Sequence, residues 1–109
     1  MDYFKHDVVQ SLATLRDAVS RIRADIAEGP VRWKDDEVGT AQEHWASWAL
    51  QSARRASRAI SVLDHPARHV LMTADEVAEV DAVRHEVAEA SARLTGSGAR
   101  LLPGDLPPT

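Results

Sequence analysis

The sequence predicts an all-α protein, a three-helix bundle with long, near-heptad helices and a C-terminal tail containing proline and leucine. Three segments carry apolar residues at the three- and four-residue steps of a helix, and two of them begin with a capping box. Breakers separate the segments, and no run alternates as a strand would. We expect helices over about 2–28, 40–64 and 73–95, so that 1–95 is the bundle and 96–109 the tail.

The first expected helix carries the clearest pattern. Its apolar residues follow one another at steps of four, four, three, four, three and four, and they form one narrow stripe. They are Phe4, Val8, Leu12, Leu15, Val19, Ile22 and Ile26. Gly29 and Pro30 end the helix, because glycine accepts the left-handed cap conformation and proline cannot continue the hydrogen-bond ladder.

The second and third expected helices both open on a capping box, in which a threonine precedes a glutamate by three residues. The boxes begin at Thr40 and at Thr73. The predicted buried face of the second helix has alanine and serine at its centre, so that the large side chains of the first helix can approach it closely. The third helix has a valine-rich face, which needs packing because valine is a mediocre helix former.

The composition favours a single domain that works in the cytoplasm and does not enter a membrane. The 109 residues contain no cysteine, which fits a reducing compartment, and no apolar run approaches the roughly 20 residues that span a membrane. The net charge of −4 argues against a generic nucleic-acid binder. Basic residues are almost all arginine, which together with abundant alanine and valine is typical of a GC-rich bacterial or phage genome.

Protein interaction is the function that the sequence favours, with a second copy of the chain as the expected partner. Several apolar residues fall outside the predicted stripes or lie in connections, and such residues can mark a partner surface. We expect the interface to use tryptophans of the second helix, two residues of its outer face and leucines of the tail. These residues are Trp45, Trp48, Leu50, Val62, Leu101, Leu102 and Leu106.

The alternative is a regulator that contacts nucleic acid through the second helix. Arg54 and Arg58 are predicted to face outward and Arg55 to lie at the edge, and such a cluster can contact phosphates. It has no interleaved aromatic residues and the rest of the chain is acidic, so nucleic acid is the less expected partner. The third helix is acidic, which predicts a charge match within the chain or between copies.

Neither a metal site, a cofactor nor an enzymatic activity is expected. His65 and His69 are four residues apart, as are His85 and Glu89, and this spacing can place two ligands on one helix face. Pro66 interrupts the first pair, and the second is predicted to point to water. Whether either pair binds metal stays open. The sequence contains no nucleophile elbow, glycine-rich phosphate loop or zinc-ligand set.

Overall fold

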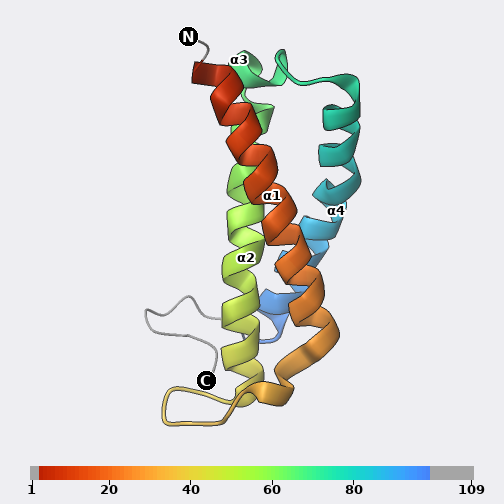
Figure 1. The fold of residues 1–109 in the computed structure, drawn as a ribbon. Coiled ribbons are helices and arrows are strands. Elements are labelled where there is room, and N and C mark those ends of the chain that lie inside the picture. Colours follow the sequence, from red (N-terminus) through yellow and green to blue (C-terminus); the bar gives the residue numbers. More distant parts are fainter. Residues whose placement is uncertain (1–2, 99–109) are drawn as a thin grey trace.

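Residues 3–98 fold as three long helices and one short helix packed together (Figure 1). This computed structural model describes residues 3–98, and no strand occurs among them. Each long helix begins and ends within one residue of its predicted bounds, and the all-α prediction is confirmed. The elements are α1 (Tyr3–Glu28), the 3-10 turn η1 (Gly29–Arg32), α2 (Ala41–Asp64), α3 (Pro66–His69) and α4 (Ala74–Gly96).

Helix α2 is the central element. α1 packs along it, α4 packs against another of its sides, and α1 and α4 contact each other least among the three (Figure 1). Four alanines of α2 are fully buried, while Leu15 and Ile22 are among the largest buried side chains of α1. The small side chains let large ones approach the α2 backbone closely, which matches the prediction. The alanines are Ala46, Ala49, Ala53 and Ala56.

The prediction for Leu50 is wrong, because α2 buries two sides. Leu50 was predicted on the outer face of the helix, but only 4% of it is exposed. Ala46, Leu50 and Ala53 follow at steps of four and three, so they share one side of α2. Asp64 continues that spacing and accepts hydrogen bonds from Arg84 of α4 at 2.7 and 2.8 Å. This side of α2 therefore faces α4.

Both capping boxes form. The hydroxyl of Thr40 accepts a hydrogen bond from the backbone N–H of Glu43 at 3.2 Å. The Glu43 carboxylate accepts one from the backbone N–H of Thr40 at 3.0 Å. Thr73 and Glu76 repeat the arrangement at 3.1 and 2.8 Å. Each box satisfies two backbone donors that the first turn of a helix leaves unpaired. The threonine–glutamate signature in the sequence therefore located the start of α2 and of α4.

Two arginine–glutamate bridges connect α1 and α4. Arg16 donates to Glu79 at 2.6 and 2.8 Å, and Arg23 donates to Glu86 at 2.7 Å through both nitrogens. Seven residues separate the bridges on each helix, so the two helices run in register across them. The predicted charge match thus forms within the chain. The glutamates of α4 that form these bridges pair with arginines of α1 and not with those of α2.

These bridges make part of the stability sensitive to acid. Hydrogen bonds from Arg16 and Arg23 hold the pKa of Glu79 and of Glu86 below the usual 4.5. A carboxylate with a lowered folded pKa stabilises the fold above its unfolded pKa and loses that contribution as the pH falls through the folded value. We expect the melting temperature to drop below about pH 4.5.

The readout is the difference between the parent and the double variant Arg16→Gln/Arg23→Gln in circular dichroism melts across this pH range. Other carboxylates with lowered pKa values, such as Asp17 and Asp64, keep their partners in both proteins, so their contribution cancels. The variant should lose less stability on acidification than the parent. Parallel pH profiles would show that the bridges contribute nothing in solution, as many exposed ion pairs do.

Candidate functional site

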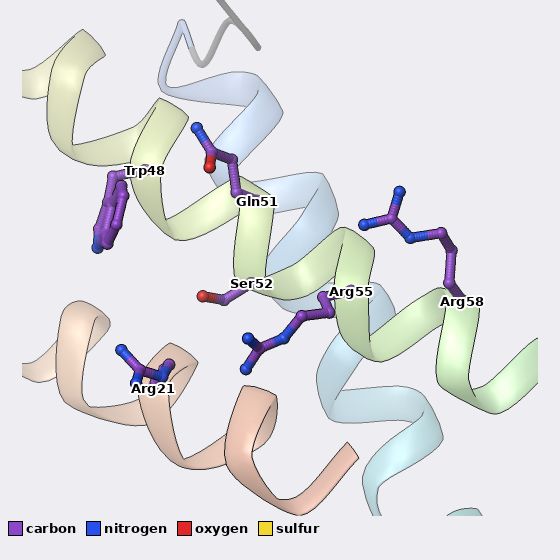
Figure 2. A pocket seen from close by; sticks show the side chains of 6 residues that line it. All are labelled: Arg21, Trp48, Gln51, Ser52, Arg55 and Arg58. Atoms are coloured by element: carbon purple, nitrogen blue, oxygen red, sulfur yellow. The ribbon is translucent and has the colours of Figure 1, made fainter. Parts of the chain in front are cut away.

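A basic pocket of about 220 Å³ lies between α1 and α2 (Figure 2). One of its lining residues comes from α1 and five come from α2, at steps that bring their side chains to neighbouring positions on the helix surface. Three of the six are arginines and one is a tryptophan. The lining residues are Arg21, Trp48, Gln51, Ser52, Arg55 and Arg58.

The ring of Trp48 contacts a second tryptophan ring. Trp33 lies against it with the ring centroids 6.4 Å apart and the planes tilted by 45°. Trp33 in turn stacks on His44, also at 6.4 Å, with an angle of 14°. The segment after η1 therefore folds over this end of α2 and buries Trp33. Trp48 itself stays half-buried and borders the pocket.

The three arginines of the pocket differ in their partners. Arg55 donates to Asp17 of α1, and Arg21 donates to the same carboxylate oxygen at 3.1 Å. The hydrogen bond from Arg55, and to a lesser extent the one from Arg21, holds the pKa of Asp17 below its usual value. Arg58 makes no ion pair within residues 3–98. One carboxylate thus pairs with two of the three guanidinium groups, and the pocket is positively charged.

Every polar side chain that lines the pocket can donate hydrogen bonds, and none is acidic. The Nε atom of Arg55 is buried and has no hydrogen-bond partner among the described residues. Figure 2 shows Ser52 and Arg55 directed toward the α1 side, while Gln51 and Arg58 extend away from α1 at the rim. The pocket therefore suits a ligand that is negatively charged and rich in acceptors.

The predicted interface residues fall into different settings. Trp45 is buried, and its indole N–H donates to the carbonyl of Asp25 at 2.7 Å, so it belongs to the core together with Leu50. Trp48 lines the pocket, and Val62 lies on the surface with 36% of it exposed. The three tail residues are outside the described residues 3–98. They are Leu101, Leu102 and Leu106.

The structure divides the predicted basic cluster. Arg55 and Arg58 line the pocket, whereas Arg54 is exposed and does not. Sequence reasoning missed that Trp48 lies on the same side of α2 as Arg55, although their spacing of seven residues indicates it. It could not find Arg21, because only the packing of α1 on α2 brings that residue to the pocket.

Two grooves between α1 and α4, of about 300 and 330 Å³, are weaker candidates. Arg23 lines both, and the bridges to Glu79 and Glu86 cross this face. Their charged walls therefore already neutralise each other. The charges leave little potential to attract an ion.

The histidine pairs are accounted for by local contacts. His85 and Glu89 pair at 2.9 Å and are both largely exposed. The Nδ1 atom of His65 accepts the N–H of Ala67 at 3.2 Å, which caps the start of α3. Within residues 3–98 no group of three or more metal-ligating side chains comes together.

Comparisons with protein-family models, with curated proteins and with solved structures find no match to this chain. In the part that the structure describes, no helix is both long enough and apolar enough to cross a bilayer. The surface of the bundle and its pocket are therefore the features that bear on function.

Proposed function

We propose that the chain is a small helical protein-interaction module, of bacterial or phage origin, that associates with itself. Its contact surface is the end of the bundle where α1 begins and α2 ends (Figure 1). Five of the seven large apolar side chains that are exposed among the described residues belong to this end. They are Tyr3, Phe4, Val9, Val62 and Val70.

Contacts around these side chains support an ordered surface. The guanidinium group of Arg68 lies 5.1 Å from the centroid of the Phe4 ring and pairs with Asp7 at 2.9 Å. The Nζ atom of Lys5 donates to the carbonyl of Leu71 at 3.1 Å. These contacts tie the start of α1 to α3 and to the turn after it. Apolar side chains surrounded by charged groups have the composition of a protein interface.

A second copy of the chain is the partner that we propose first. A dimer with twofold symmetry places the same patch on both subunits, so an apolar end can bury itself against its own copy. The role is one of binding, without a catalytic step or a cofactor, and the cytoplasm remains the expected location. Contact with nucleic acid through Arg54, Arg55 and Arg58 as one patch has less support, because Arg55 faces α1 and donates to Asp17.

The test is the mass in solution of the parent and of the double variant Val62→Glu/Val70→Glu. Light scattering after size exclusion should give a multiple of 11.9 kDa for the parent and a monomer for the variant. Both side chains are exposed, so the helical circular dichroism spectrum should not change. Charges introduced at the contact would separate the subunits, because an unpaired charge resists burial.

Val31→Glu is the matched control. It makes the same change at an exposed valine of η1, at the opposite end of the bundle, and should keep the mass of the parent. A parent of 11.9 kDa at all concentrations would contradict self-association. A double variant that keeps its oligomeric mass would contradict the proposed surface.

A further inference from the structure

We propose that the pocket between α1 and α2 binds a nucleotide, with its phosphate at the arginines and its base against Trp48. The ligand is either a free nucleotide or one nucleotide unit of a single-stranded nucleic acid. This inference uses other residues than the proposed self-association, so either can fail without the other.

Charge selects a phosphate. Arg21 and Arg55 share the single carboxylate of Asp17, and Arg58 has no ion pair with any described residue. Guanidinium groups bind phosphate oxygens through paired hydrogen bonds, which are stronger than bonds between neutral groups. No acidic side chain lines the pocket, and the neighbouring carboxylate of Asp17 is already paired with two of its arginines.

The ring of Trp48 selects a planar group beside the phosphate. Trp33 lies against Trp48, so the position of the ring is restricted before a ligand arrives. Every nucleobase has a π-face that can lie on such a ring, and base–aromatic stacking is sequence-tolerant. An aromatic platform next to arginines is the combination found in proteins that bind single strands. The arginine cluster seen in the sequence gains this platform only in the folded chain.

The size of the pocket limits the ligand to one nucleotide. Its volume of about 220 Å³ is below the roughly 300–1,000 Å³ of sites that enclose a drug-sized molecule. One ring and one phosphate can contact the wall while the sugar remains in solvent. Gln51 and Arg58 at the rim can then contact a further phosphate or the next unit of a strand (Figure 2).

The experiment titrates the full chain with AMP, adenosine, inorganic phosphate and a short oligothymidylate. Binding is followed by tryptophan fluorescence and checked by calorimetry. Trp33 and Trp45 are buried, so quenching by a stacked base reports on Trp48. AMP should bind at least about ten-fold more tightly than adenosine or phosphate, since only AMP carries both groups. Equal binding of AMP and phosphate would overturn the role of the ring, and no saturable binding would overturn the proposal.

Two variants make the test specific to the pocket. Arg58→Gln removes a lining charge without breaking an ion pair and should weaken AMP binding about ten-fold. Arg54→Gln makes the same change four residues earlier on the exposed face and should leave binding unchanged. Equal losses in both variants would indicate attraction by overall charge and overturn the site.

The oligothymidylate separates the two sources of the ligand. Tighter binding than AMP with a steep decrease at higher salt indicates a strand, because bound phosphates release counterions. Binding of AMP as tight as that of the strand indicates a free nucleotide. In both cases Arg58→Gln must weaken binding, because only then does the ligand bind at the pocket.

Discussion

Replacing Leu50 with glutamate is expected to remove a large part of the free energy of unfolding and to lower the melting temperature strongly. Leu50 lies on the side of α2 that faces α4, with 4% of it exposed. The change removes a buried leucine and places a carboxylate where no water reaches it, for a combined loss of about 4 kcal/mol or more. A chain of this length has only about 5–15 kcal/mol of stability in total.

Val31→Glu is the control for Leu50→Glu, because Val31 lies outside the proposed contact surface. It belongs to η1 with 84% of it exposed, so a glutamate there can reach water. Surface changes of this kind usually stay within about 0.5 kcal/mol. Circular dichroism at 222 nm during thermal and urea unfolding measures both variants. A Leu50→Glu protein that melts like the parent would mean that α4 does not cover this side of α2.

The helices could be predicted from the sequence because the signals are local. Thr40 and Thr73 each cap a first turn with the glutamate three residues later, and this geometry depends only on neighbouring residues. Gly29 adopts a φ of 69° at the end of α1, a conformation that glycine accepts without strain. These signals fixed the ends of the elements to within one residue.

The buried sides of α2 could not be predicted in the same way. The sequence pattern predicts a single apolar stripe on each helix. Such a pattern is typical of a bundle in which three helices contribute equally to one core. In the structure α2 is central and needs a second buried side, where Ala46 and Leu50 contribute. Alanine gives a weak hydropathy signal, so this side looked like surface. Which helix is central depends on tertiary packing, and periodicity along one helix does not report it.

Only part of the pocket could be predicted from the sequence, for a related reason. Trp48 and Arg55 are seven residues apart on one helix, so their common side is a property of α2 alone. Arg21 and Asp17 belong to another helix, and their approach requires the close packing of α1 on α2. Without Trp48 and Asp17 beside them, the arginines of α2 have the pattern of an ordinary solvated helix face.

That close packing gives the second large expected effect. Ala56→Leu should lower the free energy of unfolding by about 1–3 kcal/mol. Ala56 is 0% exposed and lies seven residues from the buried Ala49 and three from the buried Ala53 and Ala59, in the row that forms the core side of α2. Three added carbon atoms have no space there, so α1 must move away or side chains must leave their preferred rotamers.

Ala92→Leu in α4 provides the comparison, because Ala92 is exposed and the same atoms enter solvent. Alanine and leucine have similar helix propensity, so this change should leave the urea midpoint nearly unaltered. If Ala56→Leu also left it unaltered, the helices would not approach closely at this row. That result would also contradict the pocket, since Arg21 lines it together with Trp48 and Arg55 only when α1 packs directly on the alanines of α2.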